Sequence, residues 1–187
     1  MVICNTKFNT VSLQIKQLFI YGRYKKLKRG IPQTRWFCRS CRGKGCRKCQ
    51  YTGKLYSTSI EKLISEPIIN ECLGTDSSFH GAGREDIDVR MLGNGRPFVV
   101  EINNPVKRSF SLDKITEEIN KENKEIIEVS NLHFCMKKEI KRLKAAAFKK
   151  VYLVEIEAKN GFKRENLLKV ALALRGKIIE QYTPTRV

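Results

Sequence analysis

The stretch FHGAGREDIDVRMLGNGRPFVVEI, from Phe79 to Ile102, joins a highly charged loop to a compact apolar run. The run RPFVVEIN, residues 96–103, has the β-branched and aromatic composition of a buried strand. In an extended segment Asp86 and Asp88 share one face, while Glu85 and Ile87 take the other. Charge and spacing are compatible with a salt-bridged surface turn or a reactive carboxylate. They do not choose among the three acids.

Strands and helices alternate after this stretch. Further strands are expected over residues 125–135 and 151–158 and in GKIIEQYT, residues 176–183. Helices are expected over residues 112–123, 137–150 and 164–174, the first with Ser111 as its cap. This alternation predicts an α+β fold, in which a mixed sheet is covered by helices.

The N-terminal part combines an expected strand with a basic segment. Residues 11–20 alternate apolar and polar side chains, and the sequence YGRYKKLKRGIPQTRW, residues 21–36, is expected to be an extended arm because Pro32 and the nearby Gly30 oppose a helix. Further on, Ser57 or Ser59 could cap a short helix that Pro67 is expected to break.

The charge of the chain points to a polyanionic partner. The formal net charge is +18, and the first 60 residues contain 14 Lys and Arg but no Asp or Glu. Such a segment favours a phosphate backbone over a membrane, because RYKKLKR has no apolar face to insert. The side chains expected to contact RNA are Arg23, Lys25, Lys26, Arg29 and Arg35.

A cysteine cluster follows in FCRSCRGKGCRKCQYTGK, residues 37–54. Its spacing, C-x2-C-x4-C-x2-C, suits four thiolates on one structural Zn2+, and Gly43 and Gly45 allow the chain to reverse between the two pairs. An iron–sulfur cluster and a set of metal-free thiols are the alternatives. The cysteines are Cys38, Cys41, Cys46 and Cys49.

The remaining composition indicates a cytoplasmic chain without a membrane span. Hydrophobic residues make up 41% of the sequence, but no apolar run approaches the length of a transmembrane helix. The N-terminus lacks the features of a signal peptide, and seven cysteines, an odd number, argue against a disulfide framework.

The sequence GRED, residues 83–86, and the following IDVRMLGNGRPFVVEI closely resemble the signature of the tenth family of tRNA pseudouridine synthases. This family occurs in archaea and eukaryotes, and its archaeal members modify positions 54 and 55 in the T loop of tRNA. The segments IYGRYKKLKRGIPQTRWFC, CQYTGKLYSTSIEKLI, KVYLVEI and IIEQYTPTRV also resemble the archaeal members. The resemblance extends from about residue 18 to the end.

The resemblance implies a reaction and roles for three side chains. Asp86 matches the aspartate that acts as the family's nucleophile or base during isomerisation of uridine to pseudouridine, without an organic cofactor. Arg84 could fill the space that the flipped base vacates or clamp a phosphate. Tyr152 matches a tyrosine that contacts the substrate, although a tyrosine in the core or on a sheet face would explain it equally well.

The resemblance also leaves parts of the family unmatched. Most of the N-terminal RNA-binding region of the THUMP type and the C-terminal end of the catalytic sheet have no counterpart. We therefore expect a remnant of the RNA-binding region with the basic arm over residues 1–34, a zinc knuckle with a short helix over 35–66 and a partial catalytic domain over 67–187. Complementary polypeptides could supply the rest. The alternatives are a non-catalytic RNA-binding protein that uses the zinc knuckle and the basic arm, and an inactive fragment.

Overall fold

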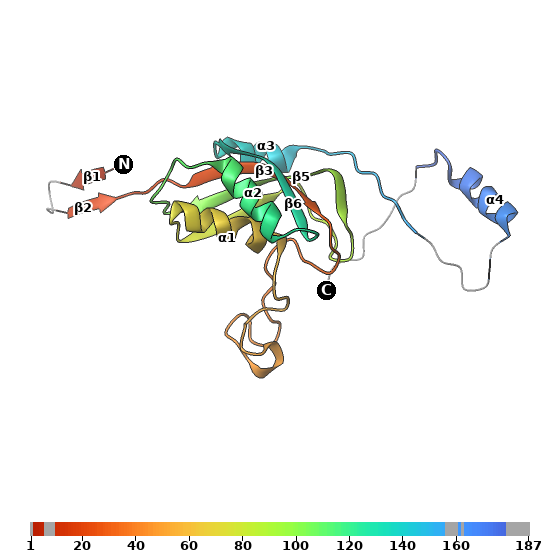
Figure 1. The fold of residues 1–187 in the computed structure, drawn as a ribbon, viewed down its shortest axis with the longest axis horizontal. Helices are drawn as coiled ribbons and strands as arrows, with labels where there is room; N and C mark the ends of the chain where they lie inside the picture. Colours follow the sequence, from red (N-terminus) through yellow and green to blue (C-terminus); the bar gives the residue numbers. More distant parts are fainter. Residues whose placement is uncertain (1, 6–9, 156–160, 162, 179–187) are drawn as a thin grey trace. The chain divides into compact units, whose positions relative to one another are not determined.

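The computed structural model describes residues 2–5, 10–155, 161 and 163–178 of the 187-residue chain. These residues belong to two compact units, Met1–Phe148 and Lys149–Val187. Figure 1 shows the elements of each unit. The expected boundaries at residues 34 and 66 are therefore not the boundaries of compact units.

A four-stranded sheet forms the centre of the first unit. Its strands are β3 (Leu18–Lys26), β4 (Asp76–Gly81), β5 (Met91–Asn103) and β6 (Ile127–Cys135), in the order β4-β5-β3-β6. Every neighbouring pair is antiparallel, where a mixed sheet was expected. A separate antiparallel pair is formed by β1 (Val2–Asn5) and β2 (Thr10–Leu13). The α+β class is confirmed.

One face of the sheet carries the main apolar core. Helices α1 (Ile60–Cys72) and α2 (Leu112–Glu122) cover this face (Figure 1). Ser111 caps α2 by accepting a hydrogen bond from the backbone N–H of Lys114, as expected. The buried side chains of α2 are Leu112, Ile115 and Ile119, whose spacing of three and four residues places them on one face of the helix.

Helix α1 continues through Pro67, where the sequence predicted a break. Ser59 caps it, and Ile60, Ile64 and Ile68 are completely buried at intervals of four residues. A proline inside a helix costs about 3 kcal/mol. Burial of each isoleucine contributes about 1.5–3 kcal/mol, so the buried row outweighs the proline.

The opposite face of the sheet is covered by α3 (Lys138–Ala145). Leu143 is buried against this face in a smaller apolar cluster with Val99, and the half-buried Ile140 packs against the same cluster. Helix α3 was expected to be longer, over residues 137–150. It ends where Ala146 adopts an extended conformation.

The first part of the expected basic arm, residues 21–26, belongs to strand β3, the second strand from one edge of the sheet. Side chains of β3 alternate between buried and half-buried from Leu18 to Lys26, because successive side chains of a strand point to opposite faces and one face carries the main core. The lysines and arginines obscured this period of two in the sequence. The segment is therefore part of the sheet, and a boundary at residue 34 would separate β3 from its partners.

The second unit contains α4 (Arg164–Leu174), with the expected bounds. Residues 151–155 are not in a strand, although a strand was expected over 151–158. The rest of that stretch, and residues 179–183 of the last expected strand, lie outside the described residues. Among the helices that the structure describes, none has the length and apolar composition needed to cross a lipid bilayer.

Replacement of Ile64 by alanine tests the packing of α1. Ile64 is completely buried in the main core, so Ile64→Ala should lower the free energy of unfolding by about 2–5 kcal/mol. Glu66→Ala, at an exposed position of the same helix, should change it by less than about 0.5 kcal/mol. Urea denaturation measures both. Equal effects would contradict the packing described for α1.

Candidate active site and metal centre

The three acidic side chains of the loop between β4 and β5 differ in their exposure to solvent. Asp86 and Asp88 are exposed, whereas the Glu85 side chain is only 2% exposed. Arg84 is also exposed. The extended segment expected there is a turn, in which the backbone N–H of Val89 donates to the Asp86 carbonyl at 3.2 Å. The inward acid is Glu85.

The carboxylate of Glu85 lies in a buried polar cluster. Its Oε2 is 2.9 Å from Nε of Arg96, whose side chain is 5% exposed. The phenol oxygen of Tyr24 lies 2.8 Å from both carboxylate oxygens of Glu85. Gln33 Nε2 donates to Glu85 Oε2 at 3.1 Å and to the Gly83 carbonyl at 3.1 Å. The cluster therefore holds both the side chain and the backbone of the loop.

The hydrogen bond between Tyr24 and Glu85 has a fixed direction, from the phenol to the carboxylate. Burial, and then the neighbouring carboxylate of Glu85, raise the pKa of Tyr24 far above its usual value, so the phenol stays protonated and donates. Arg96 also donates to the carbonyl of Ala82 at the start of the loop. A buried carboxylate with these partners is compensated, whereas an unpaired one would be costly.

Lys26 holds the same loop from a second side. It is completely buried, and its Nζ donates to the carbonyls of Ile31, Asp86 and Ile87 at 3.1, 2.9 and 3.0 Å. Burial lowers the pKa of Lys26, while the carboxylates of Glu85, Asp88 and Asp86 oppose that shift. The expected RNA contact of Lys26 is therefore replaced by a structural role, because its ammonium group is inside the protein.

The other expected RNA contacts do not form one arm. Arg23 donates from Nε to the Asn94 carbonyl at 2.6 Å and from Nη2 to the Gly95 carbonyl at 2.8 Å. Lys25 pairs with Glu128 at 2.9 Å. Of these expected contacts, Arg29 and Arg35 are exposed, as is the neighbouring Lys28.

The structure places the two other substrate-contact candidates in different units. Arg84 lies two residues before Asp86 in the same loop. Tyr152 belongs to the second unit and is 68% exposed. It is not on a sheet face, which was the alternative explanation for it.

Sequence reasoning missed the polar cluster around Glu85. The sequence feature that could have indicated the cluster is Arg96, which directly precedes a buried apolar run. A buried charge at that position needs a partner of opposite sign. Nothing in the local sequence connected it with Tyr24 or Gln33, which lie more than 60 residues earlier.

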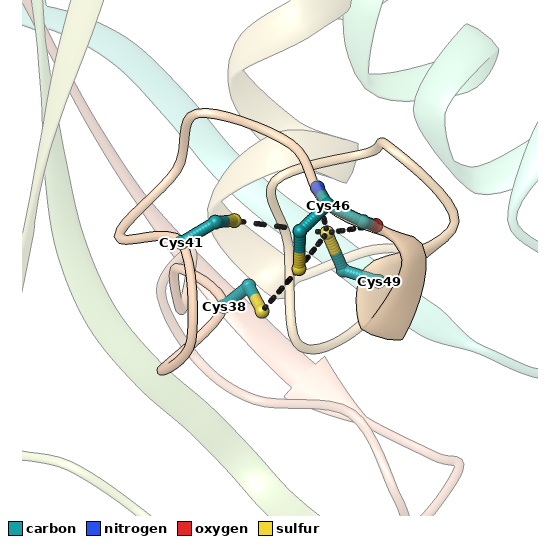
Figure 2. A group of neighbouring side chains, drawn as sticks. All are labelled: Cys38, Cys41, Cys46 and Cys49. Carbon is teal, nitrogen blue, oxygen red and sulfur yellow. Dashed lines mark hydrogen bonds between the residues drawn. The ribbon is translucent and has the colours of Figure 1, made fainter.

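The four clustered cysteines converge on one point (Figure 2). All their Sγ atoms lie within 4.8 Å of one another. Three Sγ–Sγ distances are 3.7–3.9 Å. Four thiolates at about 2.3 Å from a tetrahedral ion would lie about 3.8 Å apart. The site could therefore hold one metal ion, and the close approach of the sulfurs leaves little room for a multinuclear cluster.

Backbone geometry supports the convergence of the cysteines. Gly43 and Gly45 have φ values of 96° and 89°, so the expected reversal between the two cysteine pairs is present. Backbone N–H groups of Gly45 and Gly53 donate to Sγ of Cys41 and Cys49. Although desolvation raises the pKa of Cys49, N–H donors from Cys46 and Gly53 lower it to about 6, which favours the metal-binding thiolate.

Exposed cations surround this centre. Five basic side chains between and beside the cysteines are at the surface. They are Arg39, Arg42, Lys44, Arg47 and Lys48.

Comparison with known proteins identifies the relatives of the chain. Residues 19–187 match the family model described as "Pus10, C-terminal". The chain is 51% identical to the tRNA pseudouridine synthase Pus10 of Methanocaldococcus jannaschii over 177 residues, which cover 95% of the chain and 38% of the relative. The protein of the same name from Methanothermobacter marburgensis is 49% identical, over 95% of the chain and 44% of the relative. The chain thus spans less than half the length of either relative.

The buried position of Glu85 predicts unequal effects of removing the acids. Glu85→Ala leaves Arg96 without its counter-charge and should lower the free energy of unfolding by about 3–5 kcal/mol. Asp88→Ala, at an exposed position three residues later, should change it by less than about 0.5 kcal/mol. Chemical denaturation of the two variants measures the difference. A loss from Asp88→Ala as large as that from Glu85→Ala would refute this assignment.

The cysteine geometry predicts one metal ion per chain. Elemental analysis of the purified chain should find one equivalent, and Cys46→Ser should lose most of it because one of four ligands is removed. Cys135→Ser, which changes a cysteine outside the cluster, should retain the metal. Full metal content in Cys46→Ser, or loss in Cys135→Ser, would contradict the site.

Proposed function

The chain belongs to the Pus10 family, and from this membership we propose that it carries the part of a tRNA pseudouridine synthase that contains the reactive carboxylate. The single observation that carries the proposal is the orientation of the acids in the loop. Glu85 is held inside by Arg96, and Asp86, the aspartate of the GRED sequence, is exposed beside it. A reactive carboxylate has to be accessible to a nucleotide, and its neighbour supplies the anchor.

The proposed reaction is an isomerisation of uridine within the RNA chain. Asp86 acts as a nucleophile or base while the bond between N1 of uracil and C1′ of the ribose breaks. The uracil rotates, C5 bonds to C1′, and the proton of C5 is lost while N1 gains one, so that the net composition is unchanged. The carbonyl of Asp86 is bound by Lys26 throughout, which fixes the backbone from which the carboxylate projects.

The target base has to leave its stack before it reaches Asp86. Base flipping costs a few kcal/mol and needs a group that occupies the vacated space. Arg84 is exposed in the same loop and is proposed for that role or for a phosphate contact. Tyr152 is exposed in the second unit and is proposed to stack on the target base.

The proposed substrate is the T loop of tRNA, at position 54, position 55 or both. The net charge of +18 and the exposed Arg29 and Arg35 suit its phosphate backbone. Polypeptides that supply the remainder of the relatives' length are proposed partners, and the cytoplasm is the proposed location.

The metal centre is proposed to bind a structural Zn2+. Four thiolates with tetrahedral spacing are the donor set that zinc occupies in small knuckles. Zinc would fold residues 37–54, which have few apolar side chains, and would present the surrounding cations to RNA.

A second candidate function is RNA binding without catalysis. The five exposed basic side chains around the cysteines favour it, since they could contact phosphates whether or not Asp86 reacts. This alternative predicts binding of tRNA by the chain but no formation of pseudouridine.

The substitution Asp86→Asn tests the proposed function. An unmodified tRNA transcript is incubated with the chain, alone and together with candidate complementary polypeptides, and pseudouridine is mapped at positions 54 and 55. Asp86→Asn should lower the rate by a factor on the order of 10³ or more, because the amide cannot replace the carboxylate. Asp88→Asn is the matched control, and should keep activity within a few-fold.

Two results would reject the enzymatic role. One is an absence of pseudouridine in every preparation with the unchanged Asp86, and the other is equal activity of Asp86→Asn and the unchanged chain. Binding of tRNA in the first case would favour the non-catalytic alternative.

A further inference from the structure

Helix α3 and the sheet beneath it border a shallow, open groove, and four of its eight lining residues are lysines. The groove includes four lysines from α3 and the residue that precedes it, and the strands contribute one histidine and one glutamate. These residues are Lys137, Lys138, Lys141, Lys144, His80 and Glu101. Lys137, Lys141 and Lys144 follow the spacing i, i+4, i+7 and form a row along one face of the helix.

In the part of the chain that the structure describes, none of the four lysines forms an ion pair. The acid of α3, Glu139, pairs with Arg142 at 2.8 Å instead. Glu101, at the floor of the groove, lies 3.0 Å from Nε2 of His80. The lysine charges are therefore available to an external anion.

The positions of these lysines in α3 do not stabilise the helix. Basic side chains stabilise the C-terminal end of a helix but oppose the dipole at its N-terminal end. Lys137 is the N-cap residue of α3 and Lys138 is its first residue. The N-cap position makes no side-chain hydrogen bond to the helix. Like charges at spacings of three and four residues cost a few tenths of a kcal/mol each, so the row disfavours the helix unless a polyanion neutralises it.

The helix is attached to the sheet in a way that fixes the row. Leu143 is buried against Val99, and the half-buried Ile140 packs on the same cluster. Because α3 uses these apolar side chains against the sheet, it has no apolar face left to insert into a membrane. A chain of phosphates is the partner that fits a fixed row of exposed cations.

We propose that the groove of α3 is a docking surface for the phosphate backbone of RNA. Its lysines are distant in the sequence from the GRED loop, whereas His80 lies just before that loop. This inference rests on the proposed function, which names tRNA as the substrate, and it adds a surface of the protein that binds the tRNA. The lysine row of Lys137, Lys141 and Lys144 contacts successive phosphates. The residues that line this groove include none of the basic residues of the first 60 positions.

The slope of affinity against salt concentration tests the docking surface. The full chain and a variant with Lys137→Gln, Lys141→Gln and Lys144→Gln are titrated with an unmodified tRNA transcript over a range of salt concentrations. Each phosphate contact contributes about 0.7–0.9 to the slope of log affinity against log salt. The triple variant should therefore lose about 2–3 from the slope.

A charge-matched variant separates a local contact from the effect of net charge. Lys114→Gln, Lys121→Gln and Lys124→Gln remove three exposed lysines from and beside α2, on the other face of the sheet. This control should change the slope by less than 1. Thermal unfolding of both variants shows that the fold is kept, as expected for exposed positions.

Two outcomes would overturn the docking surface. One is an equal loss of slope in both triple variants, which would reduce the effect to net charge. The other is binding to vesicles of anionic phospholipid that depends on the row, while binding to tRNA does not. The binding titration does not depend on catalysis. A chain that forms no pseudouridine would reject the enzymatic role, and the salt dependence of tRNA binding would still test the docking surface.

Discussion

The buried ion pair between Glu85 and Arg96 is the constraint on which the loop depends. An ion pair that loses one partner in the interior costs about 3–5 kcal/mol, so Glu85 has to face Arg96, Tyr24 and Gln33. With the Glu85 side chain directed inward, its neighbour Asp86 remains exposed in the loop. The acid that cannot react thus anchors the loop that carries the acid proposed to react.

Lys26 extends this constraint from the side chains to the backbone. Its ammonium group binds carbonyls of Asp86 and Ile87 in the loop and of Ile31 just after β3. Strand β3 supplies both Tyr24 and Lys26 from the face that carries the main core, so the loop is fixed to a strand that is hydrogen-bonded on both sides. A carboxylate carried by such a loop is positioned before any substrate arrives, which is what catalysis by a single side chain requires.

Local sequence patterns predicted much of this structure. The remainder depends on contacts between residues far apart in the sequence, which those patterns do not specify. The strand after the GRED sequence, the cap and buried face of α2 and the four converging cysteines all follow from spacing within a few residues. The role of β3 did not, because five basic residues among residues 23–29 concealed its alternation. Glu85, Tyr24 and Lys26 are brought together by strand pairing over about 60 residues, which no local pattern specifies. The extent of α1 depended on tertiary burial that exceeds the cost of Pro67.

The most direct test is the reactivity of the three acids toward a water-soluble carbodiimide and an amine, read by peptide mass spectrometry with and without tRNA. The account predicts that Asp86 and Asp88 are labelled in the folded chain, that Glu85 is protected, and that tRNA protects Asp86. Labelling of Glu85 as fast as Asp88 would contradict the buried anchor. Unchanged labelling of Asp86 in the presence of bound tRNA would contradict its place at the substrate.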